Sequence, residues 1–329
     1  MCKKGPGHYY TGLDPIYPAV DRSSVRENML KNDWGKSHFN KTALFFLLPS
    51  VLVIIFIMMY PIIYGIIMSF TNRFFSYNNY IFIGLRNYGV ILQDPIFYKA
   101  LLNSLKLAIF TIIFDTLIGF GLAIWINSRE TYTKIFRVLL FLPWILPSTV
   151  VAFAFRWLYN DYYGYCNYIL VKWHIIQVAV NPLAASKLVW PAIILPEVWF
   201  SYPFVMLVFA AALKSINPNI YEAARIDGAN RWRIFTNITL PSLKSTFIML
   251  TVLQIIWEMA SFDLVFLLTH GGPANATLTL SLYIYKMAFE YQKIGYACAL
   301  ATTMFLIMVI LIIVFYKFYQ YGDENEEMV

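Results

Sequence analysis

Long apolar runs separated by short polar stretches dominate the pattern along this chain. A membrane-spanning helix needs about 20 mostly apolar residues, and six runs reach that length. They cover residues 42–70, 99–127, 136–159, 188–213, 243–269 and 294–319. The pattern therefore predicts an all-α integral membrane protein with six transmembrane helices.

The polar ends of the chain set the predicted domain organisation. We expect residues 1–41 to form a polar N-terminal tail, residues 42–319 the six-helix transmembrane domain, and residues 320–329 an acidic C-terminal tail. The first apolar run is too long for the core of a signal peptide and has no small-residue cleavage site after it, so we expect it to stay as a span.

Composition agrees with a membrane protein. Hydrophobic residues make up 60% of the chain and charged residues only 13%, whereas about a quarter of a soluble domain is charged. The three cysteines have no spacing typical of a disulfide framework or a zinc site. The net charge of +7 is better explained by membrane orientation than by nucleic acid, because basic residues gather in cytoplasmic loops.

Basic residues predict the orientation. With the N-terminus inside, the inner segments (1–41, 128–137, 214–244 and 317–329) hold 16 Lys and Arg residues and the outer segments 8. This bias places both termini in the cytoplasm and the protein in the plasma membrane. Several runs also contain prolines, which kink helices and are tolerated where neighbouring helices or a water-filled cavity satisfy the freed carbonyl.

One cytoplasmic loop is unusually charged. It contains YEAARIDGANRWRIFTNITLPSL, residues 221–243. Asn217 and Pro218 predict the start of a short helix, Gly228 its end, and Asn230 the start of a second helix that runs towards Pro241. The small, charged first helix suits a partner's groove. The alternative is a loop on lipid headgroups, anchored by Trp232 and Arg231.

The same loop resembles the EAA loop of ABC importer permeases. The family pattern EAA-x3-G-x9-I-x-L-P is matched without a gap by Glu222, Ala223, Ala224, Gly228, Ile238, Leu240 and Pro241. Asp227 matches the form found in the carbohydrate-importing branch. The stretches 82–105, 141–161 and 262–289 also resemble maltose- and glycerol-3-phosphate-type permeases, so the resemblance covers roughly residues 42–319.

The resemblance implies a type I ABC importer permease fold and residues 214–243 as the loop that couples transport to ATP. Its implied partners are cytoplasmic ABC ATPase subunits, a second six-span permease, an extracellular solute-binding protein and the lipid membrane. It also implies that ATP and Mg²⁺ bind on the ATPase. The chain is then a non-catalytic subunit of a sugar importer.

The chain's own motifs agree with a non-catalytic role. Gly35, Lys36 and Ser37 end like a P-loop, but Leu30 stands where that motif needs glycine. The four histidines show no metal spacing, and no Ser or Cys arrangement typical of catalysis is present. We therefore expect this chain to bind no cofactor.

Ionisable residues inside the predicted spans mark a candidate substrate pathway. Each costs about 2.5–3.5 kcal/mol to insert and needs a partner or a polar cavity. Gln254, Glu258 and Phe262 follow one another at i, i+4 and predict one helix face suited to a sugar, with hydrogen-bonding groups and an aromatic ring. Glu197 is a further candidate. Asp263 lies at the start of one of the stretches that resemble the family and also fits a structural role. Asp115 is followed by several small residues, which favour a helix-packing role for it. For all of these residues, interhelical contacts are the alternative.

The alternative functions are a self-sufficient secondary transporter and an intramembrane enzyme. A self-sufficient secondary transporter would use an ion gradient, and no inverted repeat is visible to favour it. An intramembrane enzyme would need converging acid, base or metal groups, and no spacing suggests them. The sequence leaves the cargo open between a sugar, a polyol and a glycerol phosphate.

Overall fold

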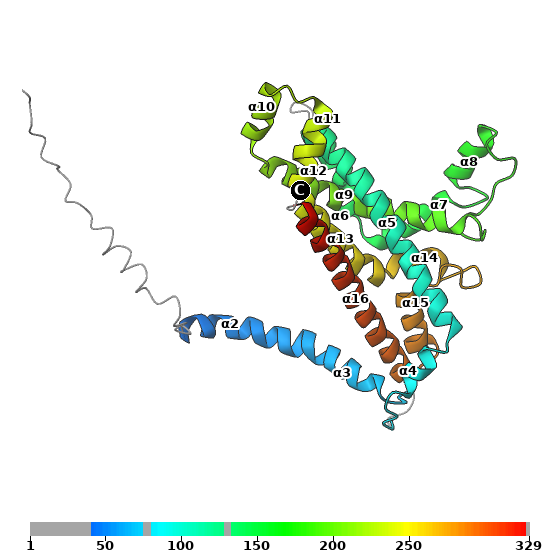
Figure 1. The fold of residues 1–329 in the computed structure, drawn as a ribbon. Coiled ribbons are helices and arrows are strands. Elements are labelled where there is room, and N and C mark those ends of the chain that lie inside the picture. The colour runs from blue at the N-terminus through cyan, green and yellow to red at the C-terminus, as the bar shows by residue number, and fades with distance from the viewer. Residues whose placement is uncertain (1–40, 75–79, 128–132, 327–329) are drawn as a thin grey trace, which may run out of the picture. The chain divides into compact units, whose positions relative to one another are not determined.

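The computed structural model describes residues 41–74, 80–127 and 133–326. Within these ranges all regular elements are helices, apart from one isolated antiparallel bridge between Thr71 and Phe82. The chain divides into two compact units, residues 1–61 and 62–329, and the second unit holds most of the helices (Figure 1). Of the predicted tails, residues 1–40 and 327–329 lie outside the described residues, while residues 320–326 continue the last helix, α16 (Ile294–Glu326).

The described part of the first unit is one apolar helical segment with a widened turn. It comprises α2 (Lys41–Val53), the π-helical turn η1 (Ile54–Met59) and the start of α3 (Tyr60–Ser69). The NH of Tyr60 bonds to the carbonyl of Ile55, five residues back. Pro61 follows directly, and a proline ring crowds the carbonyl four residues before it. The wide turn gives that carbonyl room within a continuous helical segment.

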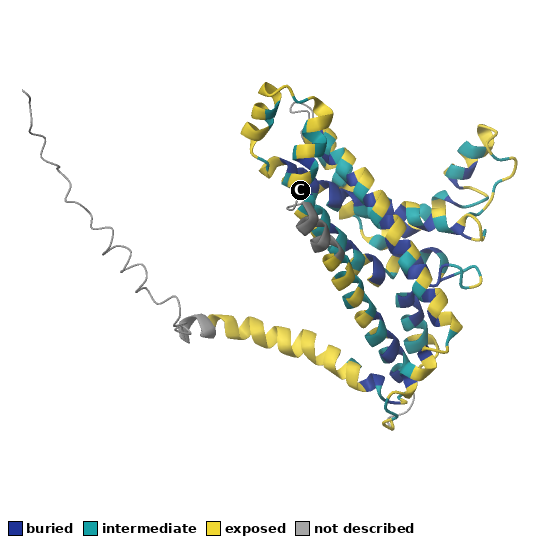
Figure 2. Cartoon of the chain, viewed as in Figure 1, coloured by how far each residue is buried: buried dark blue, intermediate teal, exposed yellow. Residues whose placement is uncertain are grey.

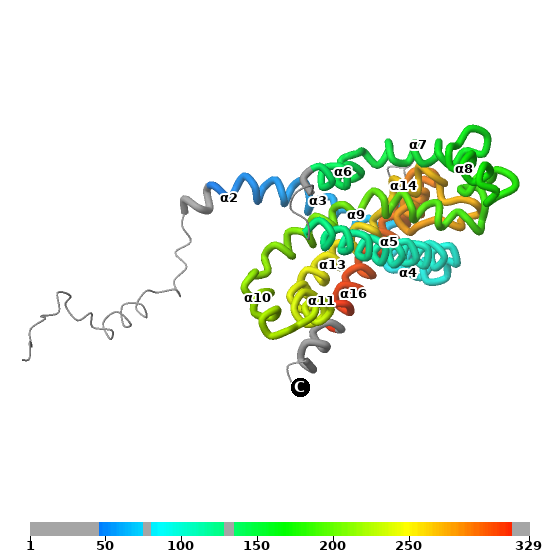
Figure 3. The backbone as a smooth tube through the Cα atoms, turned by 90° about the horizontal axis from the view of Figure 1, so that it is seen from above, coloured from blue at the N-terminus to red at the C-terminus, as the bar shows by residue number. Residues whose placement is uncertain are grey.

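The core of the second unit is the pair α5 (Pro95–Asn127) and α9 (Val189–Ser215), which lie side by side along most of their length (Figures 1 and 3). One face of α5 is fully buried at every fourth position, as helical geometry requires. This face holds Leu107, Thr111, Asp115, Gly119 and Ala123. At Gly119 an added Cβ would lie 2.9 Å from the backbone nitrogen of Met206 in α9. The glycine therefore allows the two helices to approach closely at this point.

The predicted span 136–159 is not one helix. The chain forms α6 (Thr133–Ile145) and α7 (Ser148–Leu158), and the described parts of the two differ in direction by 93°. Pro147 stands at the break with ψ of 140°. Proline has no NH to continue the helix and disfavours helical backbone in the residue before it. In contrast, Pro196 and Pro203 lie inside α9 without ending it.

The predicted span 243–269 is also divided. α13 (Lys244–Ala260) ends at Ser261, whose backbone is extended, and α14 (Asp263–Thr269) begins two residues later. Four helices in the described residues are long and apolar enough to cross a membrane. The number rises to as many as six if two bent pairs each count as one span, namely Ile135–Ile145 with Ser148–Leu158 and Arg231–Ser242 with Lys244–Ala260. The structure thus agrees with a helical membrane protein and corrects the continuity of two predicted spans.

The charged loop joins α9 to α13 and lies at one end of the second unit. It contains α10 (Pro218–Ile226), α11 (Arg231–Ile234), the π-helical turn η2 (Phe235–Thr239) and α12 (Leu240–Ser242). α8 (Tyr165–Lys172), which lies between the predicted spans 136–159 and 188–213, and the turn between α14 and α15 (Leu280–Tyr285) lie away from this loop (Figure 3). α4 (Arg86–Ile91), η3 (Lys286–Glu290) and α16 (Ile294–Glu326) complete the unit.

Candidate functional site

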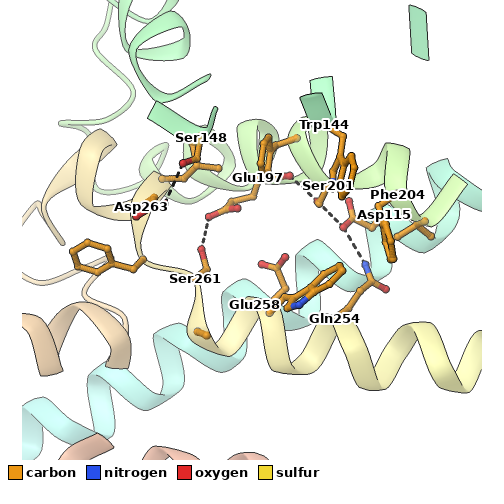
Figure 4. A pocket seen from close by; sticks show the side chains of 16 residues that line it. Asp115, Trp144, Ser148, Glu197, Ser201, Phe204, Gln254, Glu258, Ser261 and Asp263 are labelled. Carbon is orange, nitrogen blue, oxygen red and sulfur yellow. Dashed lines mark hydrogen bonds between the residues drawn. The ribbon is translucent and has the colours of Figure 1, made fainter. Parts of the chain in front are cut away.

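A cavity of about 400 Å³ opens in the middle of the second unit, within the ~300–1,000 Å³ typical of small-molecule sites. Its walls come from α5, α9 and α13, together with the break between α6 and α7 and the residues that follow α13 (Figure 4). We call it the acidic pocket, because four carboxyl side chains line it: Asp115, Glu197, Glu258 and Asp263.

Asp115 is the deepest of these groups. It belongs to the buried face of α5 and is 0% exposed. Its Oδ2 accepts hydrogen bonds from Ser201 Oγ (2.6 Å) and from Gln254 Nε2 (3.0 Å). Asp115 therefore links α5 to both α9 and α13, a role that its neighbours in sequence do not indicate.

Glu197 and Asp263 form a second polar group near the end of α13. Glu197 Oε1 accepts from Ser261 Oγ at 2.8 Å, and Asp263 Oδ2 accepts from Ser148 Oγ at 3.1 Å. Ser261 lies at the break after α13 and Ser148 at the start of α7. The two helix breaks thus supply hydroxyl groups to the pocket.

The predicted pathway residues all line the same pocket, but they do not form one continuous helix face as the sequence predicts. Gln254 and Glu258 share a buried face of α13, while Phe262 lies beyond the helix end with φ of −129°. The i, i+4 stripe therefore stops at Glu258. Phe262 still lines the pocket, and its ring packs on Phe266 and Tyr285, each with a centroid distance of 5.0 Å.

Several pocket residues were missed by the sequence analysis. They are three serines and four aromatic residues: Ser148, Ser201, Ser261, Trp144, Phe200, Phe204 and Trp257. Ser201 follows Glu197 by one helical turn, which could have marked it. The aromatic rings carried no local signal, because apolar rings are common throughout the predicted spans.

The charged loop forms as its local residues predict. The side chain of Asn217 accepts from the NH of Asn219 at 3.0 Å and caps α10, with Pro218 at its first position. Asn230 caps α11 in the same way, accepting from the NH of Arg233 at 2.8 Å. Gly228 has φ of +77°, a left-handed conformation that glycine adopts without steric cost.

The loop combines internal bonds with an exposed surface. The hydroxyl groups of Tyr221 and Thr239 lie 3.2 Å apart and connect α10 to η2. Glu222, Ala223 and Asp227 are exposed, as Figure 2 shows for most of α10. Ile226 is 86% exposed. Exposure of a large apolar side chain to water does not stabilise a short helix, so this residue is available to a partner surface.

The remaining residues of the EAA pattern lie in the second half of the loop. Ile238 belongs to η2, and Leu240 and Pro241 belong to α12. The wide turn before Pro241 repeats the arrangement before Pro61, with the NH of Leu240 bonded to the carbonyl of Phe235. The C-terminal part of the pattern therefore shapes the junction with α13.

Comparison with known proteins identifies the class of this chain. The family described as binding-protein-dependent transport system inner membrane component matches residues 115–323, which include the acidic pocket and the charged loop. The chain belongs to this family. It is thus a multi-pass membrane permease of the ABC transporter class.

Three permease proteins are similar in sequence to this chain over most of their length. The probable ABC transporter permease protein YurN of Bacillus subtilis is 30% identical over 85% of this chain and 96% of its own. The sulfoquinovosyl glycerol transport system permease protein SmoG of Agrobacterium fabrum is 30% identical over 80% and 85%. The trehalose/maltose transport system permease protein MalF of Thermococcus litoralis is 34% identical over 65% and 70%.

A solved structure shows the same fold. A chain in the crystal structure of a bacterial ABC transporter that imports the acidic polysaccharide alginate has a TM-score of 0.74, with 24% identity over 91% of this chain and 98% of that chain. The second unit therefore has the fold of an ABC importer permease, as predicted from the charged loop.

Proposed function

We propose that this chain is a membrane-spanning subunit of an ATP-driven sugar importer and that the acidic pocket forms part of its translocation pathway. The pocket offers hydrogen-bonding groups beside aromatic rings, the combination that binds sugar hydroxyls and CH faces. The names of SmoG and MalF, which refer to sulfoquinovosyl glycerol and to trehalose and maltose, support a carbohydrate cargo.

One observation carries the proposal. The charged loop directly joins α9 and α13, and these two helices carry most of the polar groups of the pocket, namely Glu197, Ser201, Gln254 and Glu258. A displacement of the loop would therefore move two walls of the pocket together. This is the connection that an importer needs between an ATPase and its cargo site.

The loop is proposed as the docking element for a cytoplasmic ABC ATPase. Glu222 and Asp227 are exposed and make no side-chain hydrogen bond or ion pair with other described residues. They can pair with basic groups of a partner, while Ile226 offers an apolar anchor. The internal bond between Tyr221 and Thr239 keeps the loop stiff enough to transmit a displacement.

The other subunits and the topology belong to the same proposal. The full importer would contain ATPase subunits that bind ATP and Mg²⁺, a second six-span permease and an extracellular solute-binding protein. This chain would span the plasma membrane six times with both termini in the cytoplasm. It would bind no cofactor of its own, and hydrolysis would occur on the ATPase.

Purification from the native membrane tests the proposal. We expect the tagged chain in mild detergent to bring with it a P-loop ATPase and a second permease, identified by mass spectrometry. The matched control is Glu222→Lys, which should lose the ATPase and keep the second permease. A folded, monodisperse chain that recovers no ATPase would contradict the proposal and favour a self-sufficient transporter.

A further inference from the structure

The acidic pocket has a charge imbalance. Four carboxyl side chains line it, and none of its lining residues is a lysine, arginine or histidine. Asp115, Glu197 and Glu258 are all at least nine-tenths buried, where charges are screened far less than at a surface. An anionic cargo entering this space would find acidic side chains and no basic side chain to pair with.

The unsatisfied polar atoms of the pocket are three oxygens, two from carboxyl groups and one from an amide. Among the described residues, Asp115 Oδ1, Gln254 Oε1 and Glu258 Oε2 are buried without a hydrogen-bond partner. Their side chains are 0%, 3% and 7% exposed. A buried acceptor without a partner is unfavourable, so a ligand that presents several donors would be stabilised here.

Asp94, a carboxylate outside the pocket, has hydrogen-bond donors on both of its oxygens. Its Oδ2 accepts from the hydroxyls of Tyr283 (2.5 Å) and Tyr296 (2.9 Å), and its Oδ1 from the NH of Ile96 (2.8 Å). The fold can therefore supply donors on both oxygens of a carboxylate. At Asp115 it supplies them on Oδ2 only, and Oδ1 is left for another donor.

The spacing of the acids points to a molecule rather than an ion. Within the described part of the chain, no three His, Cys, Asp or Glu side chains converge closely enough to hold a metal ion. Figure 4 shows Asp115 and Glu197 pointing into the pocket at separate positions, with Glu258 between them on the opposite wall. Trp144, Phe204 and Trp257 lie around the same space, and aromatic faces attract cations.

We propose that the cargo carries positive charge and is an amino sugar, or an oligosaccharide that contains one, with its amine protonated. The ammonium group would donate hydrogen bonds to the carboxyl groups of Asp115 and Glu258 once these side chains rotate, because their unpartnered oxygens are covered in the present structure. The sugar ring would pack on the tryptophans. This inference rests on the proposed function and narrows its cargo class. It excludes glycerol phosphate and other acidic cargo from this pocket.

Paired sugars that differ only in charge test the proposal. The importer, purified from its native membrane without any solute-binding protein, is placed in lipid nanodiscs in a mildly acidic buffer. Binding is measured by tryptophan fluorescence with glucosamine against glucose, galactosamine against galactose, and the glucosamine disaccharide of chitosan against cellobiose. N-acetylglucosamine serves as the neutral amide control.

We expect each amino sugar to bind at least about tenfold more tightly than its hydroxyl counterpart, the effect of one hydrogen bond to a charged group. Glu258→Gln should narrow this preference by about tenfold, and Asp115→Asn provides a second variant if the first does not fold. Glu290→Gln removes an exposed carboxylate outside the pocket and should leave the preference unchanged.

The outcomes separate the two levels of inference. Equal binding of amino and hydroxyl sugars, or a preference that neither Glu258→Gln nor Asp115→Asn alters, would overturn the cationic cargo and leave a sugar site in place. Failure of every sugar to bind would overturn both the sugar site and the charge proposal. Higher salt should weaken binding of the amino sugars more than that of the neutral ones.

Discussion

The acidic pocket and the charged loop contain the same kinds of side chain in opposite surroundings. Asp115 and Glu258 are buried in the pocket, whereas Glu222 and Asp227 in the loop are exposed. In the pocket, removing one side chain leaves its buried hydrogen-bond partners without an acceptor or donor. In the loop, the charges are solvated until another surface covers them, so their contribution depends on a partner chain.

Reversing the charge of Glu222 should have the largest effect. Glu222→Lys changes the surface that we propose faces the ATPase, and we expect uptake in intact cells to fall to background. Cargo binding in nanodiscs should be retained, because α10 makes no part of the pocket lining. Glu290→Lys, an equal reversal at an exposed site outside the loop, is the control, and normal uptake by Glu222→Lys would contradict the docking role.

Neutralising Glu197 should affect the other region. Glu197→Gln replaces a buried carboxyl group by an amide and weakens the acceptor for Ser261 Oγ. We expect the cargo concentration for half-maximal uptake to rise about tenfold, which corresponds to ~1.4 kcal/mol. The ATPase should still co-purify. If the variant lost the ATPase but kept the same cargo concentration for half-maximal uptake, Glu197 would act in coupling and not in cargo binding.

Filling the contact between α5 and α9 should destabilise the pocket without touching its polar groups. Gly119→Ala places a methyl group against the backbone of α9, and overpacking of this kind costs about 1–3 kcal/mol. The melting temperature in detergent should fall. Gly121→Ala in the same helix meets nothing within 4 Å and is the control, so equal melting of the two variants would refute the close contact.

Asp94 provides the pH-dependent test. Burial works to raise the pKa of its carboxyl, but hydrogen bonds from Tyr283, Tyr296 and backbone NH groups outweigh it and lower the pKa. Its stabilisation is therefore complete above the ordinary aspartate pKa and is lost as the pH falls through the lowered value. Asp94→Asn should cost on the order of 1–2 kcal/mol at neutral pH. The difference in melting temperature from wild type should shrink in strong acid, and a constant difference would argue against this origin.

Removing the N-cap of α10 should have the smallest effect. Asn217→Ala deletes the acceptor for the NH of Asn219, and such caps contribute about 1 kcal/mol. We expect uptake to fall partially, since a frayed helix transmits less displacement, with no change in cargo binding. Asn219→Ala keeps the backbone donor and should behave as wild type. Equal uptake by both variants would mean that the stiffness of α10 does not limit coupling.

The loop could be predicted because its signals are local. Asn217, Pro218, Gly228 and Asn230 each favour one backbone conformation, and the structure confirms the turn and both caps. The pocket could be predicted only in part. Gln254 and Glu258 share a face because helical spacing is regular, but Asp115 meets Gln254 across 139 residues of sequence, and no local pattern indicates that pairing.

The prolines show the same limit at the level of whole helices. Pro147 ends one helix and begins another, whereas Pro196 and Pro203 continue through α9. All three lack the NH that a helix needs, so the sequence marks each as a potential break. Packing decides between these outcomes, since α9 is held along its length by α5 and α6. This is information that a run of apolar residues does not contain.

The sharp turn between α6 and α7 has a consequence for biosynthesis. At 1.5 Å per residue, the 13 residues of α6 and the 11 residues of α7 extend about 20 Å and about 17 Å, and a bilayer core of ~30 Å exceeds either. Both helices pack on α9, and α7 also packs on α14. These partners leave the ribosome later, so this segment waits in the nascent chain for segments synthesised after it.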